Sequence, residues 1–482
     1  MWQHNMLKHA LTYHHDSALL FERIAQQPWA MLLDSGQMLN PATGKAGSQY
    51  GHYDILVAEP FITLVTQGNI TTITQNGVVE TSEEDPFLLL KNILAQYQVP
   101  KSELPFAGGT FPFAGGALGY FAYDLARRIE KLPSNAIPAI EMPEMMIGIY
   151  DWALVVDHRE KTTHLVSHAL LENTREKLDA LQALFSAAPR ASSLSTPFVV
   201  TSEVTSNMDK PCYERAFNQV KKYIDAGDCY QVNLAQRFSA QVEGDSWQAY
   251  KKLREISPAP FMAYMNLPLT ETESFQVLSN SPERFIQVSG DHVETRPIKG
   301  TRPRFSDPAQ DLKSANELEN SPKDKAENVM IVDLLRNDLG KTCAIGSVKV
   351  KQLFQLQSFA NVHHLVSIIV GKLKPSATAV DVLRSCFPGG SITGAPKLRA
   401  MQIIDELEPH RRGLYCGVIG YIGFDGNMDT NIAIRTVVNC KKVLSFYAGG
   451  GIVADSEVSK EYDETLDKAA SITTITKFFT RL

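Results

Sequence analysis

A hairpin signal at Asn76-Gly77 is the sequence feature that most constrains the fold. Two β-rich runs, residues 69–74 and 77–81, flank this dipeptide. An Asn-Gly pair connects antiparallel neighbours because both residues tolerate the positive φ angles of a two-residue turn. A run with helical periodicity follows at residues 86–96. The first part of the chain is therefore predicted to mix strands and helices, with antiparallel pairing at this hairpin.

A polar stretch divides the chain into two predicted regions. Residues 186–207 are rich in Ser, Thr, Ala and Pro and lack helical periodicity, which is typical of a linker. We predict an N-terminal region at 1–190, a linker at 191–207 and a C-terminal region at 208–482. The length of 482 residues fits two or three domains.

Composition excludes several classes of protein. The net charge of -6 gives no basic excess for binding nucleic acid. No uninterrupted apolar run reaches the ~18 residues of a membrane helix, and the N-terminus lacks the pattern of a secretion signal. The six cysteines form no Cys-x-x-Cys pair, which favours reduced thiols. We therefore expect a cytoplasmic protein that binds neither nucleic acid nor a membrane.

One lysine stands out in the stretch 294–304. Lys299 precedes Gly300, and a glycine lets the backbone approach a ligand closely. Three arginines lie within five residues of this lysine, at Arg296, Arg302 and Arg304. A lysine among other cations loses its proton more readily and can act as a nucleophile. The same residues are equally compatible with a surface hairpin that carries solvated charges.

Glu283 is a candidate acid/base partner for this lysine. It lies in the run Ser281-Pro-Glu-Arg-Phe285, sixteen residues before Lys299. Two adjacent strands joined by a turn would bring the two side chains close. A carboxyl beside a reactive amine is a natural acid/base pair.

Three further glutamates are candidate metal ligands. Glu327 shares one face of a predicted helix at 326–339 with Ile331, so its carboxylate points along the apolar stripe. Glu461 and Glu464 lie three residues apart on a predicted C-terminal helix and project to one side. Carboxylates from two helices suit Mg²⁺, which prefers oxygen ligands. A salt bridge at the start of the first helix and a plain acidic surface on the second are the simpler alternatives.

Two glycine-rich runs, a histidine and an arginine are candidate anion-binding elements. Residues 387–397 form a glycine-rich turn that enters a helix, and residues 449–451 offer a second backbone cradle. Neither spacing matches a nucleotide-binding loop. Arg435 alternates with apolar residues in a predicted strand, and its guanidinium suits a carboxylate ligand. His364 follows another histidine, so the two face opposite sides of a strand.

Together these motifs resemble the chorismate-utilising enzyme family. The resemblance rests on four runs that match the family in order and spacing, at 281–285, 325–338, 387–397 and 447–465. It covers residues 210–475, and residues 32–36 and 58–60 are similar to the N-terminal part of the amidating members. The implied fold is α+β, with large, mainly antiparallel sheets packed as a sandwich and helices outside, in four αββα layers.

The residue at position 299 separates the activities within this family. Members that form anthranilate resemble Pro-Ile-Ala-Gly-Thr where this chain has Pro-Ile-Lys-Gly-Thr. The resemblance therefore implies replacement of the C4 hydroxyl of chorismate by an amino group, giving 4-amino-4-deoxychorismate for 4-aminobenzoate and folate synthesis. It implies that Lys299 attacks C2 and that Glu283 acts on the leaving hydroxyl. Covalent catalysis of this kind splits one difficult displacement into two easier steps.

The resemblance also implies the remaining roles in the site. Lys299, Glu283 and His364 form the catalytic set, and Glu327, Glu461 and Glu464 hold Mg²⁺. The expected substrate contacts are Gly300, Thr301, Thr393, Tyr415, Arg435, Gly449, Gly450 and Gly451. Ser35, Pro260, Phe261 and Met262 resemble the tryptophan pocket of the anthranilate-forming members.

The chain lacks a Gly-x-Cys-x-Gly glutaminase nucleophile. Ammonia is therefore expected from a separate glutaminase subunit or from ammonium in solution. Three alternatives remain open. Anthranilate synthase component I would also release pyruvate, and Lys299 argues against it. An isochorismate or salicylate synthase would use water as the nucleophile. A non-catalytic chorismate-binding subunit would have no need of Lys299, Glu283 and the three glutamates.

Overall fold

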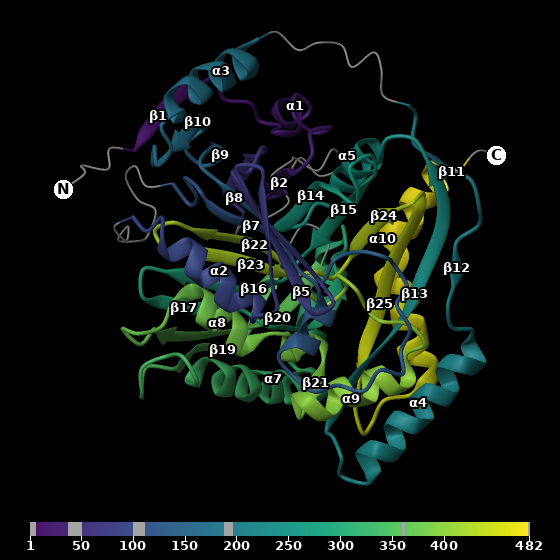
Figure 1. Ribbon diagram of the computed structural model, residues 1–482. Helices are drawn as coiled ribbons and strands as arrows, with labels where there is room; N and C mark the ends of the chain where they lie inside the picture. Colours follow the sequence, from purple (N-terminus) through teal and green to yellow (C-terminus); the bar gives the residue numbers. More distant parts are fainter. Residues whose placement is uncertain (1–5, 37–50, 100–110, 188–195, 359–361, 481–482) are drawn as a thin grey trace.

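The computed structural model describes residues 6–36, 51–99, 111–187, 196–358 and 362–480. Within these residues the chain forms two large sheets, each built of antiparallel ladders, with helices around them (Figure 1). Residues 191–195 of the predicted linker lie outside the described residues, as do residues 1–5 and 188–190 of the predicted N-terminal region.

The first sheet draws strands from both halves of the chain. Its order is β1 (Leu7–Leu11), β10 (Thr162–Ser167), β9 (Ala153–Asp157), β3 (Tyr53–Val57), β2 (Ala30–Asp34), β14 (Phe261–Pro268), β15 (Ser274–Ser281), β24 (Thr436–Cys440), β25 (Val443–Ile452), β13 (Gln231–Glu243) and β11 (Val199–Val200). Two short strands, β12 (Thr205–Ser206) and β21 (Gly394–Ala395), also pair with β13. Strands on both sides of the predicted linker thus share one sheet, and β11 and β12 fall within that linker.

The second sheet is also shared between the two halves. Its order is β18 (Ile298–Pro303), β20 (Val362–Lys372), β17 (His292–Thr295), β16 (Arg284–Ser289), β23 (Met428–Ile432), β22 (Val418–Gly423), β7 (Gly116–Phe121), β8 (Met145–Tyr150), β4 (Ile62–Gln67), β5 (Ile70–Gln75) and β6 (Val78–Ser82), and β19 (Lys349–Ser358) pairs with β20. Asn76 and Gly77 connect β5 and β6 with φ angles of 51° and 77°. The predicted hairpin is therefore confirmed, with the backbone that the dipeptide favours.

The helices begin where the sequence supplies caps. They are α1 (Ala18–Phe21), α2 (Pro86–Ala95), α3 (Thr174–Ser186), α4 (Lys210–Asp225), α5 (Ser246–Ile256), α6 (Pro308–Glu319), α7 (Pro322–Gly340), α8 (Ala379–Cys386), α9 (Lys397–Leu407) and α10 (Val458–Phe478), with 3-10 turns η1 (Tyr123–Arg128) and η2 (Gly390–Ile392). Ser321 accepts from the Asp324 amide at the start of α7, and proline occupies the first helical position. Both features stabilise a helix N-terminus, and they start α7 four residues before the predicted Ala326.

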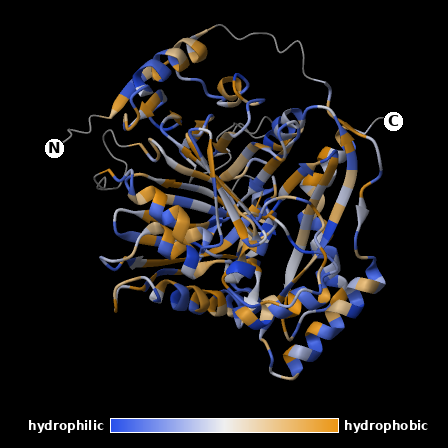
Figure 2. Cartoon of the chain, in the orientation of Figure 1, coloured by the Kyte–Doolittle hydropathy of each residue, from blue (hydrophilic) through white to orange (hydrophobic). Residues whose placement is uncertain are grey.

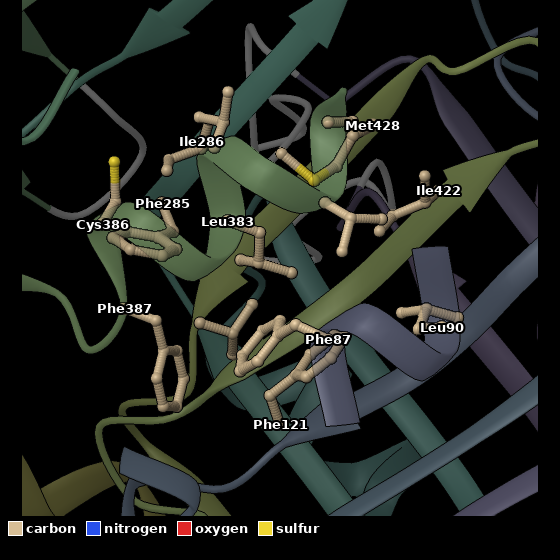
Figure 3. Packing of buried hydrophobic residues seen from close by; sticks show 14 of the residues in the cluster. Phe87, Leu90, Phe121, Phe285, Ile286, Leu383, Cys386, Phe387, Ile422 and Met428 are labelled. Carbon is tan, nitrogen blue, oxygen red and sulfur yellow. The ribbon is translucent and has the colours of Figure 1, made fainter. Parts of the chain in front are cut away.

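Three apolar layers hold the two sheets and the helices together. Side chains from both sheets meet in the central layer, among them Met31, Tyr120, Met146, Met265 and Val277. The outer face of the second sheet packs against α2, α7 and α8 through a cluster that includes Phe87, Phe121, Phe285 and Leu383 (Figure 3). The outer face of the first sheet packs against α3, α5 and α10 through Leu32, Leu56, Leu178, Trp247 and Ile472. The peripheral helices accordingly carry both hydrophobic and hydrophilic positions (Figure 2).

This order of helix, sheet, sheet and helix confirms the predicted α+β sandwich. One predicted strand is wrong. Residues 432–439 do not form a single strand, because β23 ends in the second sheet and β24 begins in the first. Arg435 lies in the connection with a φ angle of 50°. It therefore does not alternate with apolar residues on a strand face.

Candidate active site

One cavity of about 930 Å³ brings most of the predicted site residues together. Its walls come from β18 and β20 of the second sheet, β25 of the first sheet, and helices α7 and α10. The predicted residues on its wall are Glu283, Lys299, Gly300, Thr301, Glu327, His364, Tyr415, Arg435, Gly449, Gly451, Glu461 and Glu464. Segments from residue 283 to residue 464 thus converge on one chamber.

Lys299 lies on a bulged strand and not at the tip of a hairpin. It pairs with Leu365 in β20, and the register then shifts by one residue between Lys299 and Thr301. Gly300 has a φ angle of 79°, and a Cβ atom there would lie 2.6 Å from Cδ1 of Leu318. A bulge with glycine in this conformation re-aims the neighbouring side chains. Lys299 is half-buried and lines the cavity, which excludes the surface-hairpin alternative.

The charges around Lys299 differ from the sequence prediction. Each neighbouring arginine pairs with a carboxylate: Arg296 with Glu294 at 2.6 Å, Arg302 with Asp324 at 3.1 Å, and Arg304 with Asp311 at 2.9 Å. The positive charge of Lys299 lowers the pKa of Glu283, Glu327 and Glu464 against the opposing effect of burial. The prediction that cations surround the lysine is therefore wrong. The three arginines are neutralised by carboxylate partners of their own. The side chains whose charges interact with Lys299 are the carboxylates of Glu283, Glu327 and Glu464.

Glu283 is a buried carboxyl with a nearly neutral pKa. It is 6% exposed, and the Ser391 hydroxyl donates to its Oε1 at 3.3 Å. Burial raises the pKa of Glu283 to about 7, against the opposing charge of Lys299. A group that titrates near the working pH can both give and accept a proton during a reaction.

His364 is held as a neutral imidazole. It is 4% exposed, and its Nδ1 lies 2.9 Å from the Thr301 hydroxyl. Burial lowers the pKa of His364 to about 4, and the nearby Arg435 adds to this effect. The ring can therefore offer a hydrogen bond to a ligand at neutral pH without adding a positive charge.

Arg435 presents a half-buried cation to the cavity. In the described part of the chain, its guanidinium forms no hydrogen bond or ion pair with another side chain. Burial lowers the pKa of Arg435, while Glu283 opposes that effect. Its carbonyl accepts from the Asn280 amide at 3.0 Å, which fixes the connection between the sheets. A half-buried guanidinium without a side-chain partner suits an anionic ligand.

The three candidate metal ligands come from α7 and α10. Glu461 is buried, accepts from the Ser456 hydroxyl at 2.6 Å and lies 3.7 Å from Nζ of Lys323. Glu464 pairs with Lys468 at 2.6 Å. Burial raises the pKa of both Glu327 and Glu461. Lysines of this chain thus pair with Glu461 and Glu464, and the charges of Lys299 and Lys323 oppose the effect of burial on the pKa of Glu327.

The glycine run 449–451 supports these carboxylates from within β25. A Cβ atom at Gly450 would lie 3.2 Å from Oε2 of Glu461 and 3.5 Å from Oε1 of Glu464. All three glycines pair with residues 233–235 of β13. The glycine run is therefore part of the strand, which continues to Ile452. Its missing side chains let the two carboxylates lie against the strand.

The donor set fits a hydrated Mg²⁺ ion. Among the described residues, no group of three His, Cys, Asp or Glu side chains converges tightly enough to form a ready-made metal cluster. Mg²⁺ keeps several waters and needs only one or two carboxylates directly. Glu461 and Glu464 lie together over Gly450, and Glu327 lines the same cavity. Their oxygen chemistry suits such an ion.

Comparison with known proteins decides the family. The family described as chorismate binding enzyme matches residues 49–474. The chain belongs to this family.

Two curated relatives of this chorismate binding enzyme share nearly half of its residues. Aminodeoxychorismate synthase component 1 of Klebsiella aerogenes is 48% identical over 452 residues, covering 94% of each chain. The protein of the same name from Escherichia coli (strain K12) is 47% identical over 463 residues, covering 96% of each chain. Among solved structures, anthranilate synthase component I from Streptococcus pneumoniae TIGR4 has a TM-score of 0.75 and 31% identity, covering 88% of this chain and 93% of that chain.

Two predicted substrate contacts of this chorismate binding enzyme lie behind the residues that line the cavity. Thr393 is fully buried, and its hydroxyl donates to the carbonyl of Gly389 at 2.9 Å. Gly450 lies beneath the carboxylates as described above. Both shape the cavity without lining it.

Sequence reasoning missed Ser391, Lys323 and Lys468, which also line the cavity. Lys323 precedes Glu327 by four residues, and Lys468 follows Glu464 by four. An i, i+4 partner of a candidate ligand on a helix is close in space. That spacing was a usable signal for both lysines. The sequence signal for Ser391 was weaker, because it is only a hydroxyl within the glycine-rich turn 387–397.

A second cavity, of about 270 Å³, is lined by all four residues of the predicted tryptophan pocket: Ser35, Pro260, Phe261 and Met262. Asp54 fixes one end, accepting from both the amide and the hydroxyl of Ser35 at 2.7 Å. The structure thus brings these residues together around a hollow. Tryptophan binding there stays a prediction.

Two predictions about the whole protein concern its thiols and its location. All six cysteines are free thiols. Within the described residues, no helix combines the length and the apolar character needed to cross a membrane. Location in the cytoplasm stays a prediction.

Proposed function

We propose that this chain replaces the C4 hydroxyl of chorismate with an amino group and forms 4-amino-4-deoxychorismate. The observation that carries the proposal is the placement of Lys299 and Glu283 on the wall of one cavity, with Arg435 beside them. Relatives at 48% and 47% identity named aminodeoxychorismate synthase component 1 support the same reaction.

Substrate binding follows from the charges of the cavity. Chorismate is a dianion, and Arg435 offers a half-buried guanidinium for one of its carboxylates. Tyr415 stacks on Tyr447 with ring centroids 5.3 Å apart, which gives a rigid wall beside the ring. The neutral imidazole of His364 hydrogen-bonds Thr301 and lies next to the substrate.

The first chemical step forms a bond from Nζ of Lys299 to C2 of the ring. Both conjugated double bonds of the ring shift, from C1=C2 and C5=C6 to C1=C6 and C4=C5, and the C4–O bond breaks. Protonated Glu283 gives its proton to the departing hydroxyl, which leaves as water. The lysine must enter this step as the free amine, and the carboxylates that face it can accept its proton.

The second step reverses the shift of both double bonds. Ammonia attacks C4, the double bonds return to C5=C6 and C1=C2, and the C2–N bond breaks to release the lysine amine. The new ammonium group passes one proton to the Glu283 carboxylate, so that this residue regains its starting form. Its pKa of about 7 suits both proton transfers.

Mg²⁺ is proposed as the cofactor, held by Glu327, Glu461 and Glu464 directly or through water. Bound there, the ion would neutralise the ring carboxylate of chorismate and hold it in place. The ion pairs of Glu461 with Lys323 and of Glu464 with Lys468 support this proposal, because a cation already lies beside each carboxylate.

Ammonia is proposed to come from a separate glutaminase subunit. The relatives carry the name component 1, which implies a second component in those proteins. This chain carries no Gly-x-Cys-x-Gly nucleophile of its own. Ammonium in solution should replace the partner in an assay.

A product assay tests the proposal. The purified chain is incubated with chorismate, Mg²⁺ and ammonium, and products are separated by liquid chromatography and mass spectrometry. We expect 4-amino-4-deoxychorismate without pyruvate. Pyruvate with anthranilate would indicate the anthranilate synthase reaction, and absence of turnover would indicate a binding subunit.

A further inference from the structure

Lys323 approaches the three carboxylates of Glu327, Glu461 and Glu464 from the solvent side. Its Nζ lies 3.7 Å from Oε1 of Glu461. The lysine side chain is 45% exposed, whereas that of Glu461 is 5% exposed. Lys323 also lies one helical turn before Glu327 on α7, and both line the cavity. Its ammonium group therefore sits where helices α7 and α10 face each other.

The charge of Lys323 acts on all three candidate metal ligands. It is among the principal charges that lower the pKa of Glu327, Glu461 and Glu464. Glu461 and Glu464 lie together over Gly450, and the charge of Glu464 raises the pKa of Glu461. Like charges so close need a compensating cation. Lys323 at Glu461 and Lys468 at Glu464 supply it in this chain.

A second lysine, Lys468, is anchored differently. It donates to the carbonyl of Gly449 at 2.9 Å and pairs with Glu464 at 2.6 Å. Lys323 has no such backbone anchor among the described residues, and its one ion pair there is with Glu461. A half-exposed lysine on a flexible stem can turn into solvent at little cost. Of these two lysines, Lys323 is therefore the one whose ammonium group can move away from the carboxylates.

We propose that Lys323 is a built-in counter-ion that competes with Mg²⁺ for these carboxylates and must swing out when the metal binds. This inference rests on the proposed metal site of the synthase reaction. It adds that the affinity for the metal is set by a residue that is not a ligand. It also predicts that the first turn of α7 changes its contacts on metal binding.

Calorimetric titration of Mg²⁺ into the full chain tests this competition without any turnover. The set comprises the wild type, Lys323→Met, Lys323→Arg and the control Lys325→Met. Lys325 lies on the same turn of α7, with its ammonium 5.9 Å from the ring centroid of Phe354. Lys323→Met should bind Mg²⁺ about tenfold more tightly, since one unit charge no longer repels the ion. Lys323→Arg and Lys325→Met should stay close to the wild type.

Several results would overturn the inference. Equal or weaker binding by Lys323→Met would show that the lysine does not compete. An equal gain in Lys325→Met would show only a general charge effect. Absence of Mg²⁺ binding in every variant would remove the metal site and this inference with it, while the product assay with ammonium would still decide the reaction. Thermal melting with and without Mg²⁺ confirms that each variant is folded.

Discussion

The Ser391 hydroxyl donates to the Glu283 carboxyl across 108 residues of sequence, with 3.3 Å between Oγ and Oε1. Ser391 belongs to the turn η2, and Arg412 fixes this turn by donating to the carbonyl of Ile392 at 3.0 Å. Arg412 is itself fully buried and paired with Glu408 at 2.6 Å. The orientation of the proposed proton donor therefore depends on an ion pair beneath the cavity.

Ser391→Ala should shift the pH dependence of the reaction. The bond from Ser391 lowers the pKa of Glu283, so its loss raises that pKa above about 7. The protonated form is the active one, so the alkaline fall in kcat/KM should move up by about half a unit to one unit. The rates are measured at a fixed concentration of free ammonia. Ser385→Ala, which loses a bond to the carbonyl of Val382 and a contact with the Cys386 thiol but none with Glu283, should leave the profile in place. If the alkaline fall in kcat/KM stayed at the same pH in Ser391→Ala, the role of this bond would be refuted.

Glu283→Gln should make the folded protein more stable at pH 8 but not at pH 5. Burial raises the pKa of Glu283 from 4.5 to about 7, so the folded state holds its proton more tightly than the unfolded chain. The stability that this tighter proton binding gives the folded state is fully present below pH 4.5 and is lost as pH rises through 7. The gain at pH 8 should be about 1–3 kcal/mol, measured by urea denaturation. The exposed Glu319→Gln should show no such difference between the two pH values. An equal effect of Glu283→Gln at both would contradict the account.

Arg435→Met should raise the KM for chorismate without lowering stability. The guanidinium is half-buried and has no side-chain partner in the described part of the chain, so its loss breaks no ion pair and relieves part of a desolvation cost. Loss of a charge-assisted contact to a carboxylate should raise KM about 10- to 100-fold. Steady-state kinetics and thermal melting measure the two effects. Arg399→Met, which removes the exposed pair with Asp228, serves as the control. A lower melting temperature with unchanged KM would assign Arg435 a structural role.

Gly300→Ala should displace Lys299 and reduce kcat. The position has a φ angle of 79°, and a Cβ atom would clash with Leu318 at 2.6 Å. The strain should cost about 1–3 kcal/mol. Gly290→Ala is a matched control, because its φ angle is 63° but its Cβ would meet nothing within 4 Å. If both variants kept full activity, the bulge would not position the lysine.

Local sequence patterns predicted parts of the scaffold. The Asn76-Gly77 turn and the helical run at 86–96 follow from local preferences and agree with the structure. The residues of the cavity were predicted from family motifs, which the match over 49–474 supports. Their roles in catalysis stay predictions.

The errors arose where tertiary pairing overrides local pattern. The stretch 432–439 is apolar enough for one strand, but the chain passes between sheets there and Arg435 takes a positive φ angle. Gly449 to Gly451 remain in a strand because β13, more than 200 residues earlier, supplies the partner. Charge partners such as Asp311 for Arg304 depend on contacts between separate elements, which spacing alone does not reveal.

Intact-mass spectrometry of the chain with chorismate and no ammonia tests the central claim most directly. The wild type should gain the mass of chorismate less one water, and peptide mapping should place the adduct on Lys299. Added ammonium should discharge it as 4-amino-4-deoxychorismate, and Lys299→Ala should form no adduct. Product formation by Lys299→Ala at the wild-type rate, or an adduct that persists in that variant, would contradict the assignment of Lys299 as the nucleophile.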